Sequence, residues 1–293
     1  MIDTMKVQAQ KQHHFGRLTA LLVGVAALAA GFLAWYWYTS SAEIARDEQA
    51  LTALMQQVDT RIAEIEAKKN EPVYITLKGA DSIRALVEDY NDPSSLWAMA
   101  NKQRSLPMNY KPADLKIPNV PTRTDKSDEE RSVRGDVTGP LKKLFDAAEK
   151  DGHKLMIGSA YRSASLQTFY FNSYVASSGL EAANQYSAKP GQSEHQLGLS
   201  VDISTLSQQC YLSECFTSTP DGQWLARNAY KYGFHLRYPL GKEAITGYNF
   251  EPWHYRYVGV DLATALYQSG LTLEEAWPSL QTALTTLKEN RAL

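Results

Sequence analysis

The stretch QSEHQLGLSVDIS, residues 192–204, places a histidine and an aspartate seven residues apart. Asp202 stands between the β-branched apolar residues Val201 and Ile203, a pattern typical of a buried β-strand. A buried carboxylate is costly unless a cation or a metal ion compensates its charge. The stretch therefore predicts a strand with one compensated carboxylate, and His195 as a candidate neighbour of that site.

Composition indicates one sizeable core in a chain of 293 residues, 44% of them hydrophobic. The formal net charge of −2 gives no reason to expect a nucleic-acid partner. Predicted strands and helices follow one another without regular alternation, and no internal repeat is found. We therefore expect an α+β fold with a small central, mainly antiparallel sheet and flanking helices.

The cellular location of the protein is indicated by residues 18–38, LTALLVGVAALAAGFLAWYWY. This stretch carries no charge and suits a membrane-spanning helix. Basic residues in the preceding tail, 1–17, predict a cytoplasmic N-terminus and an extracytoplasmic remainder at the cell membrane. The alternative is a cleaved signal peptide, but its apolar region is usually only about 7–15 residues long. An uncleaved, single-pass anchor is therefore favoured.

A helical stalk and connecting segment are expected over residues 39–92. Residues 41–70 contain no Gly or Pro, but a full heptad pattern holds only from Leu51 to Ile65. Weak self-association through residues 41–70 and a helix packed on its own chain both stay open. Apolar residues recur there every seven positions, at Ile44, Leu51, Val58 and Ile65.

Further elements are expected along the rest of the chain. Residues 93–121 hold five prolines and predict an extended wrap or a linker. The two cysteines, Cys210 and Cys215, are too few for a thiolate zinc site. They either close a small disulfide loop or stay unpaired. We expect strands within 73–79, 154–163, 233–239 and 252–260, and helices at 80–92, 139–150, 165–187 with a break at Gly179, 221–232 and 273–293.

Candidate metal ligands are His195, Asp202 and His254. His254 follows Glu251 by three residues, and the intervening Pro252 argues against a helix there. Two imidazoles and a carboxylate, with an open fourth position, are the usual plan of a catalytic zinc site. One Zn²⁺ lowers the pKa of bound water from about 15.7 to about 7, and Glu251 could then act as general base. By contrast, His235 fits a core or surface residue better.

Three separated segments resemble the VanY-type D-alanyl-D-alanine carboxypeptidases, zinc metallopeptidases of the group that includes lysostaphin-type enzymes. They are SAYRSASLQ (159–167), PGQSEHQLGLSVDIS (190–204) and RYPLGKEAITGYNFEPWHYRYVG (237–259). The resemblance spans roughly residues 96–272 and implies a catalytic domain over 93–272, followed by a C-terminal helix. It implies zinc binding by His195, Asp202 and His254, catalysis by Glu251, and substrate contacts by Arg162, Gln167 and Ser193.

Physical reasoning agrees on Arg162, because an arginine fork suits the free C-terminal carboxylate that a carboxypeptidase must recognise. A surface arginine in a weak salt bridge is the alternative. Arg134 and Arg237 are further candidates for a second cation. Trp253 and the tyrosines between 161 and 186 either line a groove for the substrate or fill the core.

The resemblance implies removal of the terminal D-alanine from peptidoglycan stem peptides by D,D-carboxypeptidase activity. An L,D-carboxypeptidase acting on tetrapeptide stems is an alternative within the same family. A non-catalytic, membrane-anchored peptidoglycan-binding scaffold is a second alternative, but it would have no need of a general base.

Overall fold

The structure is a computed structural model that describes residues 24–30, 32–33 and 41–292. The chain divides into two compact units, one ending at Asn70 and the other comprising Glu71–Leu293. In the first unit, α2 (Ser41–Lys69) is one continuous helix, which confirms the helical prediction for this segment. Self-association through this helix stays a prediction.

The predicted anchor, 18–38, lies mostly outside the described residues, and the tail, 1–17, lies wholly outside them. Among the helices that the structure describes, none is both long and apolar enough to cross a membrane.

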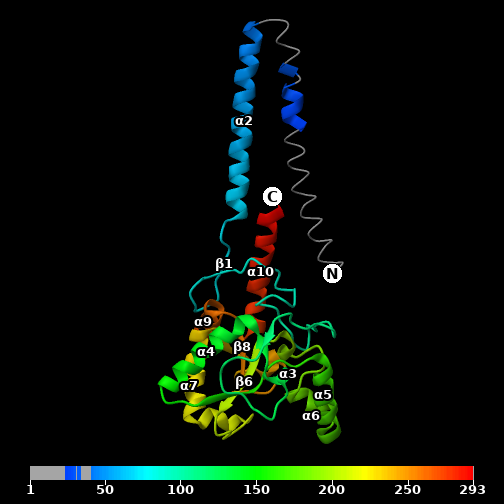
Figure 1. Cartoon of the computed structure of the whole chain (residues 1–293), viewed down its shortest axis with the longest axis vertical. Coiled ribbons are helices and arrows are strands. Elements are labelled where there is room, and N and C mark those ends of the chain that lie inside the picture. Colours follow the sequence, from blue (N-terminus) through cyan, green and yellow to red (C-terminus); the bar gives the residue numbers. More distant parts are fainter. Residues whose placement is uncertain (1–23, 31, 34–40, 293) are drawn as a thin grey trace. The chain divides into compact units, whose positions relative to one another are not determined.

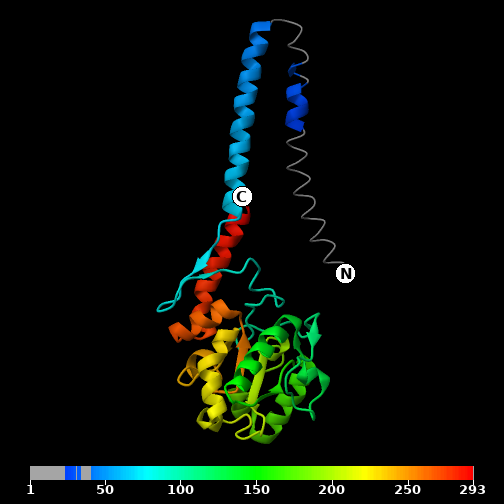
Figure 2. The same ribbon diagram turned by 60° about the vertical axis from the view of Figure 1, so that its left-hand side comes forward.

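The second unit has helices arranged around a four-stranded sheet (Figures 1 and 2). The strand order β5-β6-β8-β7 is antiparallel throughout, which confirms the predicted α+β class with a small antiparallel sheet. The described strands are β1 (Tyr74–Ile75), β2 (Ile83–Arg84), β3 (Leu115–Lys116), β4 (Val133–Arg134), β5 (Leu155–Ser159), β6 (Ser200–Thr205), β7 (Phe234–Leu236) and β8 (His254–Tyr257). The helices are α3 (Asp128–Arg131), α4 (Gly135–Lys150), α5 (Ala164–Ser178), α6 (Leu180–Tyr186), α7 (Pro220–Asn228), α8 (Glu243–Thr246), α9 (Val260–Ser269) and α10 (Leu273–Ala292), with 3-10 helices η1 (Glu194–Leu197), η2 (Glu214–Ser218) and η3 (Ala229–Tyr232).

One hydrophobic core covers a face of this sheet. Val201 and Ile203 of β6 are fully buried in it, so the β-branched pair around Asp202 packs as predicted. Helix α4 contributes the apolar stripe that its sequence spacing predicts. Its buried residues are Val137, Leu141, Leu144, Phe145 and Ala148.

A second core joins residues 71–92 to α9 and α10. The structure therefore places residues 71–92 in the second unit, whereas the sequence grouping joined them to the stalk. The predicted helix over 80–92 is wrong: β2 pairs there with β1 in an antiparallel hairpin. Buried Ile83 and Ala85 flank exposed Arg84, an alternation with the period of a strand.

Other boundaries agree more closely with expectation. The predicted helix break at Gly179 is confirmed, since this glycine has φ +81° and separates α5 from α6. Helix α4 begins at Gly135, earlier than the predicted start near Pro140, which lies inside the helix. Cys210 and Cys215 form a disulfide, so the alternative of unpaired thiols is wrong.

Candidate metal centre

Strand register places two of the predicted ligands side by side. Asp202 of β6 lies directly opposite His254, the first residue of β8. Residues opposite each other in an antiparallel pair point to the same face of the sheet. Asp202 alternates with Val201 and Ile203, so its side chain points away from the core that they fill. The pairing of these two strands therefore brings a carboxylate and an imidazole together.

The third predicted ligand, His195, comes from η1, which precedes β6. Gly198 ends this short helix with φ +68°, a left-handed conformation that favours glycine. The Nδ1 atom of His195 lies 2.5 Å from the carbonyl oxygen of Ala160 and donates a hydrogen bond to it. Since Nδ1 carries the proton, Nε2 is left with a lone pair for a metal ion.

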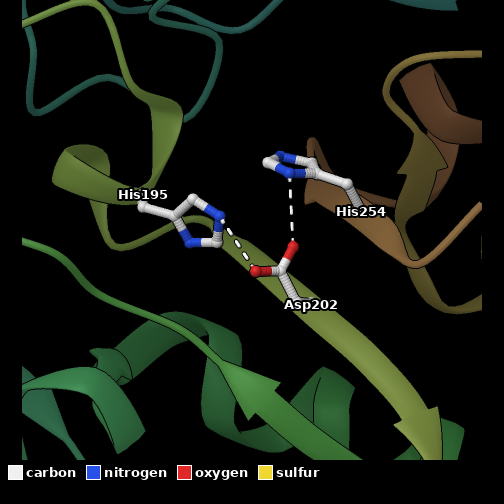
Figure 3. Close-up of side chains that lie close together, drawn as sticks. All are labelled: His195, Asp202 and His254. Atoms are coloured by element: carbon white, nitrogen blue, oxygen red, sulfur yellow. Dashed lines mark ion pairs between the residues drawn. The ribbon is translucent and has the colours of Figure 1, made fainter. Parts of the chain in front are cut away.

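Figure 3 shows both imidazoles turned toward the carboxylate of Asp202. His195 Nε2 lies 3.4 Å from Oδ2, and His254 Nδ1 lies 3.4 Å from Oδ1. Charge-assisted hydrogen bonds are shorter, at about 2.7–2.9 Å. Ligands at 2.0–2.2 Å from a tetrahedral zinc ion would be about 3.3–3.6 Å apart. One ligand atom from each of the three buried side chains lies within 4.8 Å of the other two, so they are close enough to bind one metal ion, and the donor set suits zinc.

The three candidate ligands influence one another's pKa. Burial would raise the pKa of the Asp202 carboxyl, but His195 and His254 hold it far below its usual range. Burial lowers the pKa of His195, which favours the neutral imidazole that a metal requires. Burial would also lower the pKa of His254, but the neighbouring carboxylates of Asp202 and Glu251 raise it to about 9. A metal ion bound here would displace that proton.

Glu251 lies at the edge of the same centre. Its backbone N–H donates to the carbonyl of Tyr238, and its carbonyl accepts from the N–H of His254 in a tight turn. Pro252 occupies the second position of that turn, where its fixed φ is favourable. The Glu251 Oε2 atom lies 3.3 Å from His254 Nδ1. Burial raises the pKa of Glu251, which suits a group that must both accept and release a proton.

Arg162 follows β5 and points toward the metal centre, with Nη2 3.9 Å from Asp202 Oδ2. Two side chains orient it: Gln167 accepts from Nη1 at 2.8 Å, and Ser159 accepts from Nη2 at 3.2 Å. The buried Gln167 amide also donates to the carbonyl of Ala188 at 2.6 Å. The guanidinium is thus held in a fixed orientation.

A cavity of about 330 Å³ opens onto these groups. Arg162, Ser193 and Trp253 line it, as the predicted substrate contacts require. Gln167 does not line it but contacts Arg162, which does, and a direct contact of Gln167 with substrate stays a prediction. Its other lining residues include the metal ligands and Glu251, with Tyr174, Tyr186, Tyr238 and Tyr248 among the aromatic groups.

The two further candidate arginines do not line the cavity. Arg134 lies outside the cavity lining and pairs with Asp136. Arg237 is wholly buried, with Nε 3.0 Å from Glu194 Oε2 and a second ion pair to Glu274.

The buried arginine belongs to a network that the sequence interpretation missed. Glu194, adjacent to His195, also lies 2.9 Å from Arg256 Nη1, and neither side chain is exposed. Arg256 further donates to backbone carbonyls at positions 96 and 98. The only sequence signal was a glutamate inside a stretch that is otherwise buried.

Comparison with known proteins agrees with this geometry. Residues 130–260 match the model of the VanY family, described as D-alanyl-D-alanine carboxypeptidase. A Bacillus subtilis protein named as carboxypeptidase YodJ is 41% identical over 235 residues, 79% of this chain and 86% of that protein. A D-alanyl-D-alanine carboxypeptidase of Enterococcus faecalis is 31% identical over 234 residues, 73% of this chain and 81% of that enzyme.

Two solved structures are also similar. The LD-carboxypeptidase LdcB is 45% identical with a TM-score of 0.61, covering 64% of this chain and 88% of that chain. A variant of the D,D-pentapeptidase VanY, from a VanB-type vancomycin resistance cassette and in complex with Zn(II), is 34% identical with a TM-score of 0.52, covering 64% of this chain and 99% of that chain. Identity of this extent, together with a zinc-compatible centre at the matched motifs, places the chain in the VanY family of D-alanyl-D-alanine carboxypeptidases.

Proposed function

We propose that this protein is a zinc-dependent D,D-carboxypeptidase that removes the C-terminal D-alanine from peptidoglycan stem peptides. The observation that carries the proposal is the convergence of a metal centre, a buried carboxylate and an oriented arginine on one cavity. The relatives named as D-alanyl-D-alanine carboxypeptidases, and the Zn(II) complex of VanY, support this choice of metal and bond.

Each side chain has a definable task. The Arg162 fork binds the terminal carboxylate of the peptide and fixes the position of the last residue. Zinc, when held by the three ligands, supplies Lewis-acid activation of water and of the scissile carbonyl. Glu251 takes a proton from the attacking water and passes it to the departing amine. Because burial raises its pKa, the Glu251 carboxylate is a stronger base toward the attacking water than an exposed glutamate would be.

L,D-carboxypeptidase activity is the second candidate, favoured by the 45% identity to the LD-carboxypeptidase LdcB. Both activities release a terminal D-alanine and need the same carboxylate anchor and metal centre. They differ in the residue before the scissile bond, and the pattern of ligands does not distinguish them.

The test is to incubate the purified full-length chain with pentapeptide and tetrapeptide stems and to weigh the products. Loss of one alanine from the pentapeptide, abolished by a chelator and restored by zinc, is the result we expect. Loss from the tetrapeptide alone would move the assignment to L,D-carboxypeptidase. No product from either, in protein that carries zinc, would refute both and favour the binding scaffold.

Glu251→Ala provides the matched control for the chemical step. The variant keeps all three metal ligands, so it should retain one zinc per chain while losing almost all turnover. Near-normal turnover would remove Glu251 from its proposed role.

We also propose that residues 18–38 anchor the protein in the cell membrane with the second unit outside the cytoplasm. The support is the uncharged 21-residue stretch and the basic residues before it. The chain should then sediment with membranes and resist extraction by salt and alkali, whereas recovery in the soluble fraction would refute the anchor. Cross-linking of the same membranes would test self-association through 41–70.

A further inference from the structure

One acidic side chain of the cavity has no part in the proposed reaction. Apart from Arg162, the metal ligands and Glu251, the charged residue that lines the cavity is Glu214. Its side chain is exposed, and no hydrogen bond or ion pair joins it to any other residue in the described part of the chain. An unpaired carboxylate facing a substrate cavity is free to attract a cation.

Glu214 belongs to residues 206–219, which we call the disulfide loop because Cys210 and Cys215 close it. The loop contains the three described non-glycine residues with positive φ: Gln208 at 62°, Cys210 at 57° and Leu212 at 46°. Such conformations are unfavourable for residues with a Cβ atom and persist where the surroundings impose them. The covalent closure between Cys210 and Cys215 is one such constraint.

Tyr211 packs against β5 and joins the disulfide loop to the sheet beside the metal centre. Its hydroxyl donates to the carbonyl of Gly158 at 3.2 Å, and a Cβ atom on Gly158 would lie only 2.7 Å from the ring. The next residue, Ser159, pairs with Asp202. Arg123 lies over the Tyr211 ring at 4.7 Å. Leu212 and Glu214 are thereby held in the wall of the cavity.

We propose that the disulfide loop is a specificity wall in which Glu214 recognises a free primary amine on the stem peptide, at a residue remote from the terminal alanine. The inference rests on the proposed function, because the peptide must lie in this cavity with its carboxylate at Arg162. With that end fixed by a cation, the remaining unpaired charge of the cavity is negative. A peptide with a carboxylate at its end and an ammonium group in its body complements both charges.

The test compares two stem pentapeptides that are identical except that the side-chain amine is free in one and acetylated in the other. The measured quantity is the ratio of kcat/KM for the free and acetylated peptides. Wild type should prefer the free amine by about fivefold, the effect of a partly solvated ion pair. In Glu214→Gln the ratio should fall toward one. Glu181→Gln, an exposed acidic position outside the cavity lining, should keep the wild-type ratio.

The role of the loop closure is tested by replacing both cysteines, Cys210→Ser with Cys215→Ser. This variant should also lose the preference, because Glu214 is no longer held in the wall. An unchanged ratio in Glu214→Gln, or no preference in wild type, would overturn the proposal while leaving the carboxypeptidase assignment intact.

A binding measurement separates this proposal from failure of the reaction itself. Zinc-loaded Glu251→Ala should bind the free-amine peptide more tightly than the acetylated one by calorimetry. That difference should disappear when Glu214→Gln is added. Equal affinities for the two peptides would refute amine recognition whether or not the wild type turns them over.

Discussion

Replacing Glu194 with glutamine should destabilise the second unit strongly, although the substitution changes hardly any volume. The carboxylate lies 3.0 Å from Arg237 Nε and 2.9 Å from Arg256 Nη1, and all three side chains are fully buried. Arg237 would keep its pair with Glu274, but Arg256 would keep only the carbonyl oxygens of backbone. Burial lowers the pKa of Arg256 and the Glu194 carboxylate raises it, so this carboxylate compensates the buried positive charge.

Removing one partner of a buried ion pair costs about 3–5 kcal/mol, because the remaining charge stays buried without compensation. The second unit spans residues 71–293. For a domain of that size class, 1 kcal/mol corresponds to roughly 2–4 °C in Tm, so Glu194→Gln should lower Tm by about 6–20 °C.

Thermal unfolding followed by circular dichroism measures this effect. Both proteins are treated with a chelator first, since bound zinc would stabilise the folded state to a degree that depends on its affinity. The matched control is Asp146→Asn, which breaks the exposed pair with Lys142 on α4 and should cost at most about 1 kcal/mol. If Glu194→Gln lost no more stability than this control, the buried network would contribute nothing through its charges and the reasoning would be wrong.

Three further substitutions test other contacts. Arg162→Ala should lower kcat/KM at least tenfold more for stems with a free carboxylate than for amidated stems, and an equal loss on both would argue against carboxylate recognition. Gly158→Ala should cost about 1–3 kcal/mol in urea unfolding because its Cβ meets the Tyr211 ring, and truncating that ring in the same chain should restore part of the loss. Burial would raise the pKa of Glu130, but Lys126 and Tyr170 hold it at about 2; its contribution is therefore complete above about pH 4.5 and lost as pH falls toward 2. Wild type should lose about 2–3 kcal/mol more than Glu130→Gln over that interval, and parallel stability curves would exclude the effect.

The local sequence pattern was sufficient to predict those elements in which buried residues recur at regular spacing. The β-branched residues around Asp202 and the spacing of apolar residues in α4 identify a buried strand and an amphipathic helix without knowledge of their partners. The metal ligands could also be predicted from the sequence. Few residue types bind zinc, and two of the three ligands stand in one short segment.

The remaining features depend on contacts between distant segments. Residues 80–92 have helical composition, yet Ile83 and Ala85 enter a core formed with α9 and α10, and that packing outweighs local propensity. The sequence around Glu194 does not indicate its partners, because both are distant in the chain. Arg237 directly follows β7, and Arg256 lies in β8. Gln167 matched a substrate-binding position in the sequence. The structure shows that it accepts a hydrogen bond from Arg162, so it can orient that arginine without lining the cavity itself.

The register of β6 on β8 links the stability of the fold to its chemistry. Asp202 lies opposite His254, and Ser200 lies opposite Arg256, so the metal centre and the buried charge network occupy the same face of the sheet. Val201 pairs with Tyr255 on the other face, within the hydrophobic core. A slip of one residue would turn Asp202 toward that core and bring Val201 to the metal centre. The charges that make the site chemically useful therefore also exclude the alternative register, because each would then be buried without a partner.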